Sequence, residues 1–375
     1  MDVVKFIDLT PTVALVEEQS YETWREVLSS KGFIHGKHTA EVERKLAERL
    51  GARHAICCAN GTDALVLGLM AAGIGKDDWV AVPNLTFWAS AEAPAILGCN
   101  VVLIDVGTDL HLDAAAFKAA CDAHPIKACV LPNLFGWAAT ALADMRAFCT
   151  ARGIALIEDD AQAFGVESGG ESIFKGAQVS TLSFYPAKVI GGCMDGGAVL
   201  TNDDDLAKRI RSIANHGRAE HYSYAHVGMN SRMAELNAAF LTRLLDHADT
   251  LLDGRREAFA AYRARLSDVP GLTFHAVPDG QTGNGYLTML THERLTGDEM
   301  VAKLKERGIF CGRVYPETMD MQPPAAGWTR FGSLERSRFL CRHLFSLPLY
   351  YGIAPEAVQH VCDTLIDLLA TEARA

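Results

Sequence analysis

Residues 127–158 hold two short apolar runs with a longer segment between them: KACVL at 127–131, LADMRAFCTAR at 142–152 and ALIE at 155–158. The two short runs predict strands, because they have the length of a strand and little alternation between polar and apolar residues. The longer segment predicts a helix. A strand, a helix and a strand in this order are typical of a parallel sheet with helices on both faces.

The same alternation extends outward from this segment in both directions. Further strands are predicted at residues 54–58, 79–83, 101–105, 180–184 and 197–201. Further helices are predicted at residues 13–32, 37–51, 62–72, 90–97, 113–123, 204–214 and 231–267. Beyond about residue 270 the pattern is that of a smaller α+β unit, with strands near 272–274 and 286–290 and helices near 297–307, 333–343 and 355–371. The predicted fold class is therefore α/β, with a large domain at residues 1–255 and a small domain at residues 256–375.

The composition excludes several classes of protein. The chain has 375 residues, of which 49% are hydrophobic, and this is enough for a large core. A formal net charge of −11 provides no positive field for nucleic acid. The ten cysteines form no Cys-x-x-Cys pair, which argues against zinc and favours reduced thiols. Because the chain also shows no charged-then-apolar leader and no apolar run near the ~20 residues of a membrane span, we expect a cytoplasmic protein without a membrane or metal partner.

Four segments at the ends of predicted strands are candidates for ligand binding, since parallel sheets bind ligands at that edge. The first, Asn60-Gly61-Thr62-Asp63, follows a strand and opens a helix. Free backbone amides and the positive end of a helix dipole suit a phosphate, which Gly61 would let approach closely and Thr62 would contact through its hydroxyl. An ordinary helix cap explains the same residues equally well.

The second segment, Glu158-Asp159-Asp160-Ala161-Gln162, places three carboxylates together. Such groups repel one another and need a cationic partner. A pyridinium nitrogen is one such partner, and a carboxylate that keeps it protonated turns the ring into an electron sink. The alternatives are a divalent metal ion and a solvated turn.

The third segment, residues 183–192, places Lys188 between Tyr-Pro-Ala and Val-Ile-Gly-Gly. An amine removed from water loses proton affinity and becomes a nucleophile that can hold an aldehyde cofactor. Ser183 could reach the phosphate of that cofactor, although a half-buried lysine in a turn is the alternative. The fourth segment carries Phe87 and Trp88, which could stack on a flat ring or pack in the core.

Together these segments supply a phosphate cup, a ring stacker, an anion for a ring nitrogen and an amine. These are the parts that pyridoxal 5'-phosphate (PLP) needs. A weaker alternative is a nucleotide-binding protein that uses the glycine pairs at 191–192 and 196–197 as a phosphate loop. Their spacing is not Gly-x-Gly-x-x-Gly, and no evident helix follows.

The chain resembles the DegT/DnrJ/StrS-type sugar aminotransferases, which are fold type I PLP enzymes, almost from end to end. The resemblance rests on FIDL at 6–9, GFIHG at 32–36, GTDAL at 61–65, IEDDAQAFG at 157–165, SFYPAK at 183–188, DGG at 195–197, TND at 201–203 and GMNSR at 228–232. It implies the fold type I architecture, PLP as cofactor, and a homodimer with active sites shared between subunits.

The resemblance also implies a role for individual residues. Lys188 would be the catalytic residue that carries the cofactor as a Schiff base and moves a proton. Asp159 would pair with the pyridine nitrogen, and Gln162 would contact the ring hydroxyl. The phosphate would be held by Gly61, Thr62 and Ser183, and the stacking position would be taken by Phe87. In the dimer, Asn230 would reach the phosphate of the partner subunit and Arg232 would face the neighbouring sugar site.

Three positions depart from the family pattern. Asn133 stands where a histidine is usual, and Asp320 replaces a histidine four residues after a proline. Arg313 is unexpected, and if it faces the pocket its fork could clamp a carboxylate or phosphate. A surface arginine is the alternative. Tyr315 lies in the same segment and is counted with Arg313 and Arg232 as a candidate substrate-binding residue.

The expected function is that of a PLP-dependent aminotransferase, a transaminase of EC 2.6.1 type. It would convert a nucleotide-linked 3- or 4-keto sugar to an amino sugar, with glutamate as donor, for surface polysaccharide, glycan or antibiotic sugar synthesis. One alternative is an aminotransferase that acts on a free keto sugar acid of the 8-keto-octulosonate type, which Arg313 motivates. Another is a regulatory protein that keeps the PLP fold without turnover.

Overall fold

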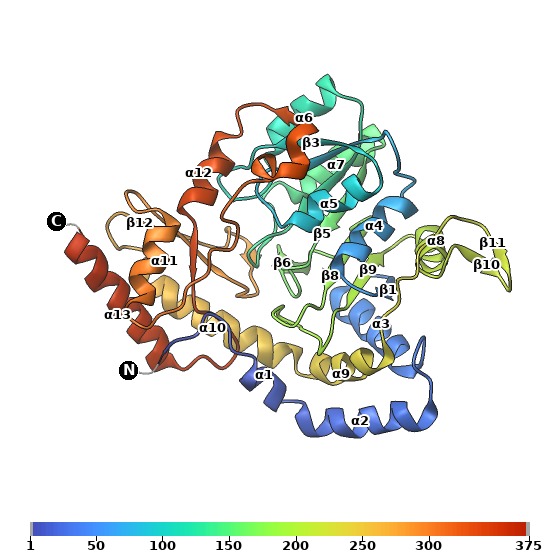
Figure 1. Cartoon of the computed structure of the whole chain (residues 1–375), viewed down its shortest axis with the longest axis horizontal. Coiled ribbons are helices and arrows are strands. Elements are labelled where there is room, and N and C mark those ends of the chain that lie inside the picture. Colours follow the sequence, from blue (N-terminus) through green and yellow to red (C-terminus); the bar gives the residue numbers. More distant parts are fainter. Residues whose placement is uncertain (1–2, 373–375) are drawn as a thin grey trace.

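The centre of the molecule is an eight-stranded sheet, seen in a computed structural model that describes residues 3–372 (Figure 1). The strand order is β1–β9–β8–β5–β4–β2–β3–β15. All pairings from β8 to β15 are parallel, whereas β9 is antiparallel to both of its neighbours. Every strand except β9 therefore ends at the same edge. The strands are β1 (His54–Cys58), β2 (Trp79–Pro83), β3 (Asn100–Ile104), β4 (Ile126–Pro132), β5 (Ala155–Asp159), β8 (Val179–Ser183), β9 (Gly197–Thr201) and β15 (Thr329–Phe331).

Helices cover both faces of this sheet, which confirms the predicted α/β class. Successive strand residues point to opposite faces, so Val80 and Val82 join one buried cluster and Ala81 joins the other. Burial on both faces explains why these strands are apolar without alternation. One cluster includes residues of α4 (Gly61–Ala71), α5 (Trp88–Ile96) and α8 (Asp204–Ala214). The other includes residues of α3 (Lys37–Leu50), α6 (Ala114–Ala123), α7 (Leu142–Arg152) and α9 (Glu235–Asp246).

The C-terminal part of the chain builds a second core around a small antiparallel sheet. The sheet contains β12 (Leu272–His275), β14 (Thr288–His292) and β16 (Phe345–Leu347). Its core is shared with α10 (Ala248–Leu266), α11 (Gly297–Lys305) and α13 (Pro355–Glu372), and α12 (Glu335–His343) lies alongside. In Figure 1 these helices occupy the end of the molecule opposite to β1 and α8. Within residues 3–372, no helix combines the length and apolar character needed to span a membrane.

Some predicted elements are divided in the structure. The helix predicted at 13–32 is two helices, α1 (Thr10–Ala14) and α2 (Glu17–Ser30), and the helix predicted at 231–267 breaks at His247 into α9 and α10. Neither break contains glycine or proline, so no local signal marked them. Short elements without a prediction are β6 (Glu167–Ser168), β7 (Glu171–Ser172), β10 (Arg218–Glu220), β11 (Ser223–Tyr224), β13 (Gln281–Thr282), η1 (Met319–Met321) and η2 (Pro323–Gly327), together with the strands β15 and β16.

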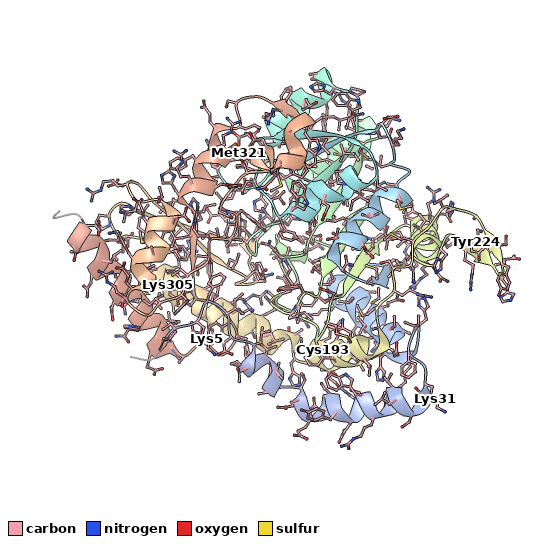
Figure 2. The ribbon with its side chains drawn as sticks, in the orientation of Figure 1. Lys5, Lys31, Cys193, Tyr224, Lys305 and Met321 are labelled. Carbon is pink, nitrogen blue, oxygen red and sulfur yellow. The ribbon has the colours of Figure 1, made fainter. Side chains whose placement is uncertain are left out.

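Two of the unpredicted features change the shape of the molecule. The hairpin β10–β11 projects from one edge, where Figure 2 shows Tyr224 near its tip. The strand β15 comes from the C-terminal part of the chain but pairs with β3 of the large sheet. The predicted domain division at residues 255 and 256 therefore does not separate the two sheets completely.

The carboxylate of Glu235 fixes the start of α3. Glu235 is 2% exposed, and it accepts hydrogen bonds from the amides of Gly36 (3.1 Å), His38 (2.6 Å) and Thr39 (3.2 Å) and from the Thr39 hydroxyl (2.6 Å). These bonds satisfy amides that the first turn of a helix leaves free. They also tie the N-terminal segment to α9.

We expect Glu235→Leu to lower the free energy of unfolding by about 3 kcal/mol, because it leaves several buried donors without an acceptor. The midpoint of urea unfolding measures this change. Glu235→Gln keeps one acceptor oxygen and should cost roughly half as much. Equal midpoints for the wild type and Glu235→Leu would contradict this role.

Candidate active site

The candidate site lies at the edge of the sheet where the parallel strands end. Asp159 is the last residue of β5 and Ser183 the last of β8, and the chain leaves β1 to enter α4 at the same edge. A Cβ added to Gly61 would lie 2.8 Å from the Cβ of Ser183, so the two segments are in contact. The structure therefore brings together the predicted phosphate segment, the carboxylate segment and the lysine segment.

The start of α4 leaves backbone amides free. The side chain of Asn60 caps the helix by accepting from the amide of Asp63 (2.8 Å), and the first helical bond runs from the amide of Ala64 to the carbonyl of Asn60 (3.1 Å). The amides of Gly61 and Thr62 precede that bond and have no partner inside the helix. The helix cap and the phosphate site are thus compatible, because the cap uses a different amide.

The close approach of α4 to the sheet depends on a glycine. A Cβ on Gly197, at the start of β9, would lie 2.3 Å from the carbonyl oxygen of Asn60. Since Gly197 pairs with both Cys58 and Ser183, it sits between the strand that leads into α4 and the strand that leads to Lys188.

The three neighbouring carboxylates have different hydrogen-bond partners. Glu158 accepts from the Nε (2.8 Å) and Nη2 (2.6 Å) of Arg146. Asp160 accepts from Asn133 (2.6 Å) and from Ser180. The side chain of Asp159 points away from those of Glu158 and Asp160, because successive strand residues alternate between the two faces of the sheet. Within residues 3–372, no group of three or more His, Cys, Asp or Glu side chains is placed to hold a metal ion.

Asp159 is left as the carboxylate of the site. It is 7% exposed and accepts from the Ser90 hydroxyl (2.7 Å) and from the Ala161 amide (3.3 Å). Burial raises the pKa of Asp159, although the bond from Ser90 and the charge of Lys188 oppose the rise. A buried carboxylate of this kind is stabilised by a further cation.

Lys188 lies on a half-buried turn beside Tyr286. Its amide donates to the carbonyl of Tyr185 (2.8 Å), and its Nζ is 5.1 Å from the centroid of the Tyr286 ring. A Cβ on Gly191 would lie 2.2 Å from the carbonyl oxygen of Pro186, so this glycine lets the turn close. Lys188 is therefore a half-buried lysine in a turn, as one of the two interpretations of the sequence proposed. The turn also places its amine near Asp159.

Gln162 connects the sheet edge to the C-terminal part of the chain. Its Oε1 accepts from the amide of Phe135 (2.8 Å), and its Nε2 donates to the hydroxyl of Tyr315 (2.6 Å). Burial raises the pKa of Tyr315 well above its usual range. Tyr315 thus stands in the site as a neutral phenol.

Asp320 holds the segment that carries Tyr315. It is buried, and it exchanges two hydrogen bonds of 2.9 Å with Asn84, which begins the loop after β2. Burial alone would raise the pKa of Asp320, but bonds from Thr318, Arg338 and Asn84 outweigh it, and the pKa is lowered. The residue that departs from the family pattern therefore joins the two parts of the chain.

The guanidinium of Arg313 is engaged within the chain. It donates to Asp298 through Nε (2.8 Å) and to the carbonyl oxygens of Cys341 (2.8 Å) and Leu344. A bidentate clamp on a substrate needs the same N–H groups. The geometry therefore provides no support for the clamp, and substrate binding by Arg313 stays a prediction.

The remaining predicted site residues lie nearer to the protein surface. Phe87 directly precedes α5 and is 58% exposed. Asn230 is exposed and Arg232 is half-buried. Between them, Ser231 accepts from the amide of Ala59 (3.1 Å), which places this segment beside the loop that leads into α4.

The sequence interpretation missed Ser90, Tyr286 and Arg146. Ser90 had a signal, since it is a polar residue in an apolar helix four positions after Thr86, and its hydroxyl bonds to both Thr86 (2.8 Å) and Asp159. Tyr286 and Arg146 had none, because their partners are distant in the sequence.

Comparison with known proteins gives consistent results. The model of the DegT/DnrJ/EryC1/StrS aminotransferase family matches residues 15–366. A protein of Geobacillus stearothermophilus named pleiotropic regulatory protein is 31% identical over 97% of this chain and 98% of its own length. A UDP-2-acetamido-2-deoxy-3-oxo-D-glucuronate aminotransferase of Pseudomonas aeruginosa is 32% identical over 96% of this chain and 99% of its own. The crystal structure of a DegT DnrJ EryC1 StrS aminotransferase from Brucella abortus has a TM-score of 0.93 at 31% identity, covering 97% of this chain and 99% of that one.

The titration of Asp160 should be visible in the stability of the protein. Burial, with the charge of Glu158, raises the pKa of Asp160 from 3.8 to about 7. Between these values the folded protein keeps a proton that the unfolded chain loses, so the free energy of unfolding falls as the pH rises from about 4 to 7.

We expect Asp160→Asn to remove this dependence, because the amide cannot ionise. Its urea midpoint relative to the wild type should rise from pH 5 to pH 8 by the equivalent of roughly 1–3 kcal/mol. Asp122→Asn, which changes an exposed partner of Arg152, is the matched control and should show no such rise. Parallel pH curves for Asp160→Asn and the wild type would refute the assignment.

Proposed function

Because the chain belongs to the DegT/DnrJ/EryC1/StrS aminotransferase family, we propose that it transfers an amino group from an amino acid, glutamate in the first place, to a nucleotide-linked 3- or 4-keto sugar. Enzymes of this family depend on PLP. The observation that carries the proposal is the meeting of Lys188, the buried Asp159 and the free amides of α4 at one edge of the sheet.

The residues at this edge suit PLP. Asp159 would hold the ring nitrogen, because its buried carboxylate is stabilised by a cation, and Gln162 would bind the ring hydroxyl. Ser183 and the amides of Gly61 and Thr62 would hold the phosphate, since together they offer a hydroxyl and the positive end of a helix dipole. When bound, PLP supplies an electron sink for the transfer of the amino group.

Three protein groups would then carry the remaining tasks. The Nζ of Lys188 would anchor the cofactor and move the proton at the carbon that gains or loses the amino group. The ring of Tyr286, 5.1 Å from this nitrogen, limits the positions that Nζ can adopt. Phe87 would lie against the face of the cofactor ring, which suits its exposed position before α5.

A nucleotide-linked sugar is preferred to a free sugar acid as the acceptor. The Pseudomonas aeruginosa relative is named for a UDP-linked 3-oxo sugar, so a 3-keto sugar is the first to test. The sugar acid depended on Arg313, whose fork is engaged with Asp298. Tyr315 and Arg232 are the remaining candidate contacts to the sugar. Such an enzyme would serve surface polysaccharide, glycan or antibiotic sugar synthesis in the cytoplasm. We keep the division into domains at residues 1–255 and 256–375 as a separate proposal.

We also propose a homodimer. Three large side chains on and near the projecting hairpin are exposed, Val227 by 88%, Tyr222 by 76% and Tyr224 by 55%. Contiguous apolar groups at a surface mark a contact with another protein. Asn230 follows the hairpin, so a partner that receives it would also receive Asn230 near its own site.

Lys188→Ala should abolish amino transfer, because no other amine would be placed to move the proton. The measurement is a mass-spectrometric assay with glutamate and a panel of UDP-, GDP- and dTDP-linked keto sugars and free keto sugar acids. The wild type should aminate a nucleotide-linked sugar, and Lys175→Ala, at an exposed ion pair with Glu171, should do so equally well. Retained turnover in Lys188→Ala would sink the assignment.

The same assay separates the alternatives. Product only from a sugar acid would replace the preferred acceptor. A regulatory protein, as the name of the Geobacillus relative suggests, would give no product and no change in visible absorbance with glutamate.

The double variant Tyr222→Asp with Val227→Asp should be a monomer, because charges would replace the apolar contacts of the hairpin. Sedimentation velocity at micromolar concentration should show half the mass of the wild type. Met321→Asp, an exposed apolar site far from the hairpin in Figure 2, is the control and should stay dimeric. A double variant of unchanged mass would exclude the hairpin as the interface.

A further inference from the structure

Arg255, on α10, is a buried cation without an anionic partner in the described part of the chain. It is 5% exposed, and no carboxylate of residues 3–372 lies within ion-pair distance of it. Its Nη1 makes only long contacts, to the carbonyl oxygens of Leu349 (3.4 Å) and Gly285 (3.5 Å), and its Nε has no hydrogen-bond partner. An unpaired buried charge is costly, so an arginine in this position calls for an anion.

Arg146 shows how the chain stabilises another buried arginine. Arg146 is also largely buried, but its fork is filled by both oxygens of Glu158, at 2.8 and 2.6 Å. Burial lowers the pKa of Arg255 to about 10, which still leaves it charged at neutral pH. Within residues 3–372, one buried guanidinium therefore has an internal carboxylate and the other has none.

Arg255 lines a cavity of about 130 Å³ beside the candidate active site. The volume is about ten times what a single water molecule needs. Ala187, the neighbour of Lys188, and Tyr286, whose ring is 5.1 Å from the Nζ of Lys188, also line it. The other lining side chains are apolar except Arg313, whose charge is paired with Asp298. The cavity thus holds one unpaired positive charge close to the lysine.

We propose that this cavity binds a carboxylate with Arg255 as its cationic partner, and that it receives a carboxylate of the amino-acid donor. The second part rests on the proposed function. A planar carboxylate can accept two N–H groups of a guanidinium, and such bidentate, charge-assisted pairs are among the stronger hydrogen bonds in proteins. Its place beside Lys188 suits the donor, because the nitrogen to be transferred must lie near that lysine.

The binding of a carboxylate can be measured without turnover. The probe is glutarate, which has two carboxylates and no amino group, and the readouts are calorimetric titration and the thermal midpoint of the PLP-loaded protein. Glutarate should bind and raise the midpoint, whereas the uncharged glutaramide and an equal concentration of chloride should do neither. Equal effects of glutarate and glutaramide would overturn the proposal.

Arg255→Met should weaken glutarate binding at least tenfold. Without ligand, its thermal midpoint should equal or exceed that of the wild type, because an unpaired buried charge has been removed. Arg256→Met is the matched control, since the neighbouring Arg256 already donates to the carbonyl oxygens of Gly283 (2.8 Å) and Gly165 (3.0 Å). It should lose stability and keep its affinity for glutarate.

If Arg255→Met does not fold, Arg255→Lys tests the same site, because it keeps the charge and loses the fork. It should still weaken glutarate several-fold. A lower midpoint with unchanged glutarate affinity in either variant would mean that Arg255 only holds carbonyl groups, and would overturn the proposal.

Steady-state kinetics show whether the bound carboxylate belongs to the amino-acid donor or to the sugar. In Arg255→Met, the KM for glutamate should rise about tenfold and the KM for the keto sugar should stay unchanged. A rise confined to a keto sugar acid would overturn the assignment to the donor. Because glutarate binding needs no turnover, a failure of the proposed function would leave that measurement intact.

Discussion

The position of one buried carboxylate, Asp159, depends on the rest of the sheet. It ends the central strand β5, and the neighbouring acids are directed elsewhere, Glu158 to Arg146 and Asp160 to Asn133 and Ser180. Each of these arrangements removes a competing charge from the edge of the sheet. The charge of Asp159 is then free to act on a ligand, with Ser90 to orient it and Lys188 nearby.

Much of the fold could be predicted because the sheet is buried on both faces. The bounds of β1, β2, β9 and α7 agree with the sequence interpretation, since each is a continuous run with a clear local end. The break at His247 and the strand β15 could not be predicted, because the first has no helix-breaking residue and the second is held by a partner more than two hundred positions away.

Part of the candidate site could also be predicted from the sequence, and part could not. The convergence of Gly61, Asp159 and Ser183 follows from the rule that parallel strands end at one edge. Contacts between residues distant in the sequence left no recognisable pattern in it. Examples are the hydrogen bond from Gln162 to Tyr315 and the ion pair of Arg313 with Asp298. Residues suited to the cofactor come from the large sheet, whereas Tyr286, Tyr315 and Arg255 come from α10 and the segments after it. The later part of the chain therefore forms one side of the candidate site.

The pairing of β15 with β3 has a consequence for how the protein is made. A chain emerges from the ribosome N-terminus first, so the large sheet can assemble while β3 is still an open edge. That edge stays available to other strands until residues 329–331 have been synthesised, and the loop that begins at Asn84 lacks its partner Asp320 for nearly as long. Chaperone binding to the nascent chain should therefore be strongest late in translation. A chain released by a ribosome that stalls before β15 would be prone to self-association through the open edge of β3.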